Sequence, residues 1–225
     1  MRWDVIPKFI PVIFEGVKIT LLVSALGILF GTIIGCIVGL VRSQKPKHPL
    51  LRIIYWLFTL YVEVVRGTPF LVQLYLMYYG PTFLFNIDLP GLTAGIIALS
   101  LNSGAYVAEI ARGSIESIDR GQMEAGRSLG LSFGQTMWYI ILPQALRRAL
   151  PPLANEFASL IKESSVISVL GVADIMFKAK TVGTAHLAVV PALAVAAVYY
   201  LLLTGITSQL VRLLERRLGK SDSHS

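Results

Sequence analysis

Long stretches of the chain carry no charged side chain, and they predict how it folds. Residues 19–41, 89–108 and 181–211 contain no Asp, Glu, Lys or Arg. Each stretch reaches the roughly 20 residues that an α-helix needs to cross a bilayer. Together with the other apolar segments they predict an all-α integral membrane protein, a single transmembrane domain over 1–225 with spans near 10–41, 52–80, 89–110, 146–172 and 183–211.

The overall composition agrees with a membrane protein. Hydrophobic residues make up 55% of the chain and charged residues 15%, against about 45–50% and 25% in soluble proteins. We interpret the formal net charge of +7 as a signal of membrane orientation, and we expect no nucleic-acid partner. The first apolar run is too long and too far from the N-terminus for a cleaved signal peptide, so we expect it to be retained as a span.

The basic residues are shared unevenly between the two faces that five spans create. Cytoplasmic loops of membrane proteins carry an excess of Lys and Arg. Five basic residues fall on one face, and two more, Lys18 and Arg66, lie within spans. The pattern predicts an external N-terminus, a cytoplasmic C-terminus and a cytoplasmic region 113–143. The opposite, basic face holds thirteen residues: Arg42, Lys45, Lys47, Arg52, Arg112, Arg120, Arg127, Arg147, Arg148, Arg212, Arg216, Arg217 and Lys220.

A sixth span is the main alternative to this topology. Residues 128–146 also lack charge. Their glycines, Ser132, Gln135 and Thr136 make a poor lipid-facing helix, and inserting the segment would move Arg147 and Arg148 to the outside. Hydropathy and charge bias therefore favour five spans.

Four glycines spaced four residues apart mark one face of the first span: Gly27, Gly31, Gly35 and Gly39. Small residues at this spacing let another helix approach closely. The pattern predicts a helix-packing seam, and it leaves open whether the partner helix belongs to this chain or to another subunit.

The sequence shows no complete nucleotide-binding or metal-binding motif. Gly219-Lys220-Ser221 ends like a nucleotide-binding loop, but Leu214 stands where its first glycine belongs. No paired-histidine metal motif occurs, and Cys36 is a lone cysteine within a span. We therefore expect a non-catalytic subunit with no metal and no cofactor of its own.

Several ionisable and polar residues are predicted to lie at membrane depth, where charge is costly and marks a partner, a wet cavity or a function. Glu63 and Arg66 are three residues apart on the second span, so they could neutralise each other on one helix face. They come just before Gly67-Thr68-Pro69, which should break or kink the second helix. Glu109 and Arg112 are interpreted as an ordinary ion pair. Polar residues also occur in the third span and near the end of the fourth: Asn102, Ser103, Lys162, Glu163 and Ser164.

Two interpretations of these residues stay open. Interrupted helices with polar side chains near the membrane centre form the solute sites of many transporters. The hypothesis is that Arg66 holds a substrate carboxylate while Glu163, helped by Asn102 and Ser164, takes a positive group of the same solute. The alternative is an ion network that only holds helices together.

One segment resembles a known family. Glu124-Ala125-Gly126, three residues, Gly130, nine residues and Ile140-Ile141-Leu142-Pro143 are similar to the EAA signature of permease subunits of ABC importers, E-A-A, three residues, G, nine residues, I-x-L-P. Only Gly126 departs from the pattern. Segments 63–69, 102–113 and 161–165 further resemble the histidine, glutamine and arginine permeases, the polar amino acid branch.

The resemblance implies an architecture and a set of partners. It implies a type I ABC importer fold, two permease subunits that are plausibly identical, two cytoplasmic ATPases that bind ATP and Mg, and an external substrate-binding protein, all at the cell membrane of a prokaryote. Its signature segment would form a coupling helix that docks on the ATPase. The coupling residues would be Glu124, Ala125, Gly126, Gly130 and Leu131, with Leu129 and Phe133 adding apolar contact.

The substrate is predicted only as a class. An acid at Glu163 favours basic polar amino acids such as arginine, lysine and histidine, although it can equally meet the α-ammonium of any amino acid. A glutamine or glutamate importer is the alternative. A passive channel is a weaker one, since it would need no ATPase docking element.

Overall fold

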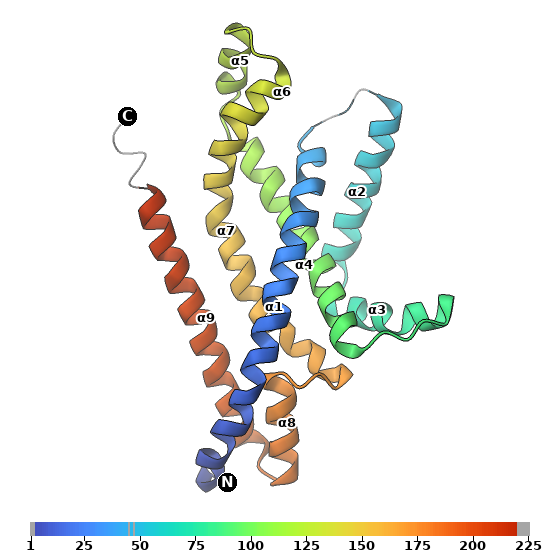
Figure 1. The fold of residues 1–225 in the computed structure, drawn as a ribbon, viewed down its shortest axis with the longest axis vertical. Helices are drawn as coiled ribbons and strands as arrows, with labels where there is room; N and C mark the ends of the chain where they lie inside the picture. The colour runs from blue at the N-terminus through green and yellow to red at the C-terminus, as the bar shows by residue number, and fades with distance from the viewer. Residues whose placement is uncertain (1–2, 45, 47, 220–225) are drawn as a thin grey trace.

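The computed structural model describes residues 3–44, 46 and 48–219, and this part of the chain is helical and contains no strand (Figure 1). Four basic residues used in the orientation argument, Arg2, Lys45, Lys47 and Lys220, lie outside the described residues. The elements in chain order are η1 (Trp3–Val5), α1 (Ile6–Arg42), α2 (Pro49–Gly67), α3 (Phe70–Phe85), α4 (Gly91–Glu116), α5 (Arg120–Ser128), α6 (Phe133–Thr136), η2 (Met137–Ile141), α7 (Leu142–Glu163), η3 (Ser164–Leu170), α8 (Ile175–Ala185) and α9 (Val189–Gly219).

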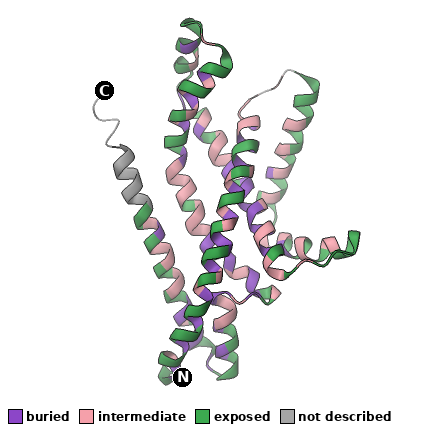
Figure 2. Cartoon of the chain, in the orientation of Figure 1, coloured by how far each residue is buried: buried purple, intermediate pink, exposed green. Residues whose placement is uncertain are grey.

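Three helical stretches among the described residues are long and apolar enough to cross a membrane: Trp3–Arg42, Gly91–Glu116 and Val189–Leu210. They run side by side with α7 through the body of the molecule (Figure 1). Buried residues gather where α1, α4 and α7 meet, and the outward faces of α1, α2 and α9 are largely exposed (Figure 2). Exposed apolar faces of this kind suit a lipid environment.

The glycine stripe of α1 packs against α4 of the same chain. A Cβ added at Gly31 would lie 2.8 Å from the Cβ of Ser103, and one added at Gly35 would lie 2.5 Å from the Cβ of Val107. Neither position has room for a side chain. The open question about the partner of this seam is thus answered: the two backbones approach closely within one subunit.

The predicted second span, 52–80, is not one helix. The chain ends α2 at Gly67, passes through an extended Thr68 and starts α3 at Phe70, after Pro69 at the N-cap. Proline disfavours a helical conformation in the residue before it, so the break predicted at Gly67-Thr68-Pro69 is confirmed. After the break, α3 points sideways out of the bundle (Figure 1).

The later elements also differ from the predicted boundaries. Regular α-helix in α7 ends at Glu163, where the 3-10 helix η3 begins, although the predicted span continued to 172. The last long helix, α9, starts at Val189, later than the predicted 183, because 183–185 complete the separate helix α8. Asp174 caps α8 by accepting a hydrogen bond from the backbone N–H of Phe177 at 2.8 Å.

Candidate functional site

The helix that carries the EAA-like residues, α5, is defined at both ends by local hydrogen bonds. Asp119 is its N-cap, and its Oδ1 accepts from the backbone N–H of Gly121 at 2.6 Å. At the other end Gly130 adopts the left-handed φ of +84°, its N–H bonds to the Arg127 carbonyl at 3.1 Å, and the Leu131 N–H bonds to the Gly126 carbonyl at 3.2 Å. This pair of bonds is a Schellman motif, which favours glycine at the left-handed position.

The segment after this turn re-enters helix through a capping box. Ser132 Oγ accepts from the Gln135 backbone N–H at 3.2 Å, and Gln135 Oε1 accepts from the Ser132 N–H at 2.8 Å. From there α6, the π-helical turn η2 and α7 follow one another without a gap, and Pro143 falls in the first turn of α7, where its missing N–H costs nothing. Residues 128–146, considered above as a sixth span, are therefore interrupted at 129–132.

The coupling residues predicted from the sequence divide by exposure. Glu124 and Ala125 face solvent on α5, and Leu129 and Phe133 are 81% and 47% exposed. Leu131 is half-buried. The elements α5 and α6, which carry most of these exposed residues, project beyond the other helices at one extremity of the molecule (Figure 1). They form a surface that a partner can reach.

The base of this surface is packed and hydrogen-bonded. Ile118, Ile141 and Ala145 form a small buried core beneath α5 and η2. Arg148 of α7 donates through Nη1 to the carbonyl of Ser117, the C-cap of α4, at 2.5 Å. These contacts join the ends of α4 and α7 at the base of the α5 surface.

Gly126, the one departure from the signature, is buried against the π-helical side of the region. An added Cβ would lie 2.5 Å from Thr136 Cγ2 and 3.1 Å from Ile140 Cδ1. The change from the signature's alanine therefore has a steric reason in this chain, because Thr136 occupies the space that a methyl group would need.

A cluster of charged side chains lies between α1, α2 and α4. Glu109 is paired with Arg42 of α1, with Arg112 at 2.8 Å and with Arg66 at 3.8 Å. The Arg66 guanidinium also stacks 5.5 Å from the centre of the Tyr106 ring. Glu63 lies 4.0 Å from Arg42, so the charge partners of both Glu63 and Arg66 are on other helices, and the expected mutual Glu63–Arg66 pair is not formed. The Glu109–Arg112 pair is confirmed as part of a wider network.

Asn102 belongs to a second cluster, at the break between α2 and α3. Its Nδ2 donates to Gln73 Oε1 at 2.9 Å. Gln73 Nε2 in turn donates to the carbonyls of Val65 at 2.7 Å and Thr68 at 3.0 Å. These carbonyls lose their helical partners where α2 ends, so Gln73 satisfies them and Asn102 fixes Gln73. Sequence reasoning missed Gln73, although a glutamine just after a Gly-Thr-Pro break was visible.

The third cluster lies on α7, opposite α4. Glu156 and Glu163 are seven residues apart on one face of α7, about 10 Å along the helix at 1.5 Å per residue, and Glu156 lies on the side of α7 toward the fully buried Ser103 of α4. Ser164 is also fully buried, but its hydroxyl already donates a hydrogen bond to the carbonyl of Ile161 at 2.8 Å. Glu156 was missed as a candidate, and its signal was the seven-residue spacing to Glu163.

The residues predicted to bind the substrate lie in three different clusters. Arg66 contacts Glu109 and Tyr106, Asn102 contacts Gln73, and Glu163 neighbours Glu156 and Lys162. Among the described residues, Arg66 and Glu163 have no contact partner in common. The idea that both hold one solute stays a prediction.

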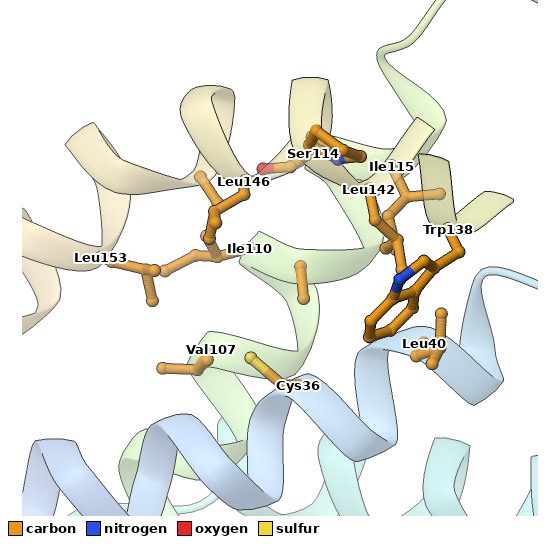
Figure 3. A pocket seen from close by; sticks show the side chains of 14 residues that line it. Cys36, Leu40, Val107, Ile110, Ser114, Ile115, Trp138, Leu142, Leu146 and Leu153 are labelled. Carbon is orange, nitrogen blue, oxygen red and sulfur yellow. The ribbon is translucent and has the colours of Figure 1, made fainter. Parts of the chain in front are cut away.

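A cavity of about 640 Å³ lies elsewhere, between α1, α4, η2 and α7. Its lining is almost wholly aliphatic, with Ser114 as a polar exception, Cys36 at one side and the indole of Trp138 at its edge (Figure 3). None of the charged clusters lines it. A polar solute would find no hydrogen-bonding complement there, so the three clusters are the better candidates for a solute site.

Comparisons with known proteins agree on one family. Residues 31–220 match the family model described as "Binding-protein-dependent transport system inner membrane component". The chain is 38% identical over 220 residues to the glutamine transport system permease protein GlnP of Escherichia coli K12, covering 96% of this chain and 97% of that protein. It is 36% identical over 213 residues to the arginine transport system permease protein ArtQ of Bacillus subtilis, covering 95% of each.

A further curated relative and solved structures extend the likeness. The L-cystine transport system permease protein TcyB of Bacillus subtilis is 38% identical, with 97% of this chain and 92% of that protein covered. Among solved structures, an amino acid ABC transporter crystallised with histidines matches with a TM-score of 0.87 and 37% identity, over 96% of this chain and 99% of the other. The MetNI methionine ABC transporter in an inward-facing conformation matches at TM-score 0.71 and 20% identity, over 90% and 95%, and supports the fold alone.

Proposed function

The chain belongs to the family of binding-protein-dependent transport system inner membrane components, as an amino acid permease of an ABC importer, and from this premise we propose that it imports basic amino acids such as arginine, lysine and histidine. Two identical copies would form the translocation path. Two separate ATPase subunits would bind ATP and Mg, and an external binding protein would deliver the substrate.

The carboxylate pair on α7 is the observation that carries the choice of substrate. Glu156 and Glu163 lie on one face of α7, seven residues apart, and Lys162 is the cation next to Glu163 in the sequence. Two carboxylates on one helix face in a membrane favour a positive group between them. A guanidinium or ammonium side chain supplies that charge, and the guanidinium fork suits two carboxylates particularly well. Asn102, Ser164 and Arg66 remain proposed contributors, with Arg66 for the substrate carboxylate.

We propose that the ATPase subunits drive transport by docking on α5. The exposed Glu124 and Ala125, on a helix fixed by Asp119 and the Gly130 turn, offer a rigid docking element to an ATPase in the cytoplasm. Closure of an ATPase dimer on ATP would displace α5, and with it α4 and α7, because Arg148 and the small apolar core connect them. The polar clusters would then face the two sides of the membrane alternately.

A transport assay in liposomes tests the substrate. The complete complex, with its ATPase and binding protein, should import labelled arginine and lysine, and unlabelled glutamine should compete weakly. Glu163→Gln should reduce arginine uptake by about tenfold, since one charge-assisted hydrogen bond is worth about 1.5–3 kcal/mol. Glu63→Gln, the same charge change in the cluster around Arg42, is the control. Equal uptake of arginine in both variants would refute the proposal.

A glutamine importer is the second candidate, and the comparisons favour it as much. A relative at 38% identity is named as a glutamine permease, and a carboxylate pair can also hold the α-ammonium of glutamine. Strong import of labelled glutamine that unlabelled arginine does not reduce would select this alternative.

A further inference from the structure

The apolar cavity between α1, α4, η2 and α7 has no part in the proposed transport. Its volume of about 640 Å³ falls in the range of about 300–1,000 Å³ that is typical of ligand sites. Among the described residues, no charged side chain lines it. Protein interiors contain few hollows larger than a water molecule, and water does not fill a hollow without polar partners. The cavity therefore requires an apolar occupant.

The cavity follows the direction of the spanning helices. On α7 its lining extends from Leu142 to Leu153, about 17 Å at 1.5 Å per residue. On α4 its lining extends from Val107 to Ile115, about 12 Å on the same scale. These lengths are close to half of the roughly 30 Å hydrocarbon core of a bilayer. The cavity thus has the length of an acyl chain in one leaflet.

The two ends of the cavity differ in polarity. The deep end, toward the middle of the spanning helices, is lined by Cys36, Val107 and Leu153. The shallow end, toward α5, is lined by Ser114 and Trp138 (Figure 3). Ser114 is only 8% exposed, and among the described residues no hydrogen bond is made by its hydroxyl. The shallow end therefore offers an unused polar group to an occupant.

A phospholipid has the same order of polarity. Its acyl chain is hydrocarbon, and the ester carbonyls at the head of the chain accept hydrogen bonds. The hydroxyl of Ser114 and the indole N–H of Trp138 are both donors. Tryptophan is also enriched where a membrane meets water, because its ring is apolar and its N–H is polar. A chain with its terminal methyl at the deep end would bring its ester to these two donors.

The cavity is open toward the lipid-facing surface. Trp138 and Leu146 line it and are 66% and 60% exposed. On α1 the lining residue Cys36 is exposed, and so are Ile33 and Ile37 beside it. The lining therefore continues into the exposed apolar face of α1, and an acyl chain can enter sideways from the bilayer.

We propose that the cavity binds one acyl chain of a membrane phospholipid from the leaflet on the α5 side, with the ester carbonyl of that chain at Ser114 and Trp138. The bound chain lies beneath α5, because Ile115 and Ala145 line the cavity and also belong to the apolar cluster under α5. It fills the space between α4 and α7 at that level. This lipid site is separate from the polar clusters and does not depend on which amino acid is carried.

Photo-cross-linking in the complete complex tests the proposal. The complex is reconstituted with its ATPase in vesicles of phosphatidylethanolamine and phosphatidylglycerol. A small share of the phosphatidylethanolamine carries a diazirine, either at the end of one acyl chain or beside its ester. The complex is then extracted in mild detergent, washed free of loose lipid and illuminated. Peptide mass spectrometry locates the attached lipid along the chain.

The two probes should attach at opposite ends of the cavity. The chain-end probe should attach near Val107 and Leu153, and the ester-side probe near Ser114 and Trp138. Attachment around the exposed Leu201 of α9 should be several-fold lower, because lipid on an open face is washed away.

Variants make the test specific to the cavity. Ala149→Phe should lower attachment about tenfold, because its ring occupies the space of the chain in an already packed wall. Ala197→Phe, the same change at an exposed position of α9, is the matched control and should leave attachment unchanged. Ser114→Ala and Trp138→Phe should each lower attachment several-fold, since each removes one hydrogen bond. These two variants decide the matter if Ala149→Phe fails to import.

Several outcomes would overturn the lipid site. One is an importing complex that retains no lipid, and another is attachment spread equally over the cavity and α9. If Cys36 is protected from N-ethylmaleimide while no lipid is attached, another protein chain covers the cavity and the proposal is wrong. Attachment of the chain-end probe at the shallow end would contradict the proposed orientation. A complex that holds lipid in the cavity but imports no amino acid would overturn the proposed function alone.

Discussion

The region around α5 and the polar clusters within the membrane are organised over very different sequence distances. Around α5 the hydrogen bonds and contacts that define the helix ends and the turn join residues two to ten positions apart, such as Ser132 with Gln135 and Gly126 with Thr136. In the membrane Asn102 bonds Gln73 across 29 positions, and Arg42 meets Glu109 across 67. A short spacing is a property of one helix or turn, whereas a long one depends on how separate helices pack.

The two regions also differ in what they leave unused. The α5 surface exposes Glu124, Ala125 and Leu129 on a base that is internally satisfied. In the membrane most of the polar groups described above pair with one another within the chain. Arg42 forms an ion pair with Glu109, and Gln73 accepts a hydrogen bond from Asn102. The carboxylates of Glu156 and Glu163 are the exception. The comparison teaches that the first region leaves its side chains free on a packed base, whereas the second uses most of its polar groups to hold helices together; this difference supports the proposed roles of a docking surface and a small solute site.

Breaking the α5 surface should have the largest effect. Glu124→Arg should abolish docking by reversing a charge, and Gly130→Asp should distort the turn, because a left-handed residue with a side chain costs about 1–3 kcal/mol. Uptake should fall by more than tenfold, toward background. Uptake and substrate-stimulated ATP hydrolysis, measured on the same reconstituted complex, check this.

The matched control is Gly113→Asp. Gly113 also has open space around it, with no atom within 4 Å of an added Cβ, but it lies in α4 without a positive φ. It should keep most of its activity. If Glu124→Arg and Gly130→Asp retain both uptake and stimulated hydrolysis, α5 is not the coupling element.

The carboxylate pair should give the next largest effect. Glu156→Gln should raise the arginine concentration needed for half-maximal uptake by about tenfold, since it removes one of two charges that face the cationic group. The effect on glutamine should be several-fold smaller. Concentration series with labelled arginine and glutamine measure both, and an equal loss for the two solutes would reduce Glu156 to a structural role.

These two regions also show what the sequence could predict. The glycine stripe and the break at Gly67-Thr68-Pro69 could be predicted because each depends on the local backbone properties of glycine or proline. The spacing of the EAA-like segment placed the side chains that are now found exposed on α5.

Long-range pairing was beyond the sequence. Glu63 and Arg66 are neighbours on one helix, yet Arg66 is drawn to Glu109 by the packing of α2 on α4. Gln73 gained its role only once α2 ended and freed the carbonyls of Val65 and Thr68. The boundary between α8 and α9 was missed because 181–211 is one charge-free run, although Pro191, in the first turn of α9, was a visible signal of a helix start.

A smaller effect is expected from Gly126→Ala, which restores the family's alanine but places a methyl group 2.5 Å from Thr136 Cγ2. Overpacking of this kind costs about 1–3 kcal/mol. We expect a several-fold loss of coupling, measured as transported solute per ATP hydrolysed. Adding Thr136→Ala should recover most of it by clearing the space. No recovery in the double variant would mean that the glycine is needed for a reason other than room.

The smallest expected effect separates structure from binding at Asn102. Asn102→Ala and Gln73→Ala each remove one end of the 2.9 Å hydrogen bond. Asn102→Ala should lower stability by about 1 kcal/mol, or about 2–4 °C in the unfolding temperature of the purified complex, and Gln73→Ala by more, because Gln73 also donates to the carbonyls of Val65 and Thr68. Because both changes break the same bond, the double variant should be clearly less destabilised than the sum of the two. Arginine uptake at saturating concentration should change little. Additive losses of stability, or an uptake defect in Asn102→Ala that Gln73→Ala does not share, would return Asn102 to the solute site.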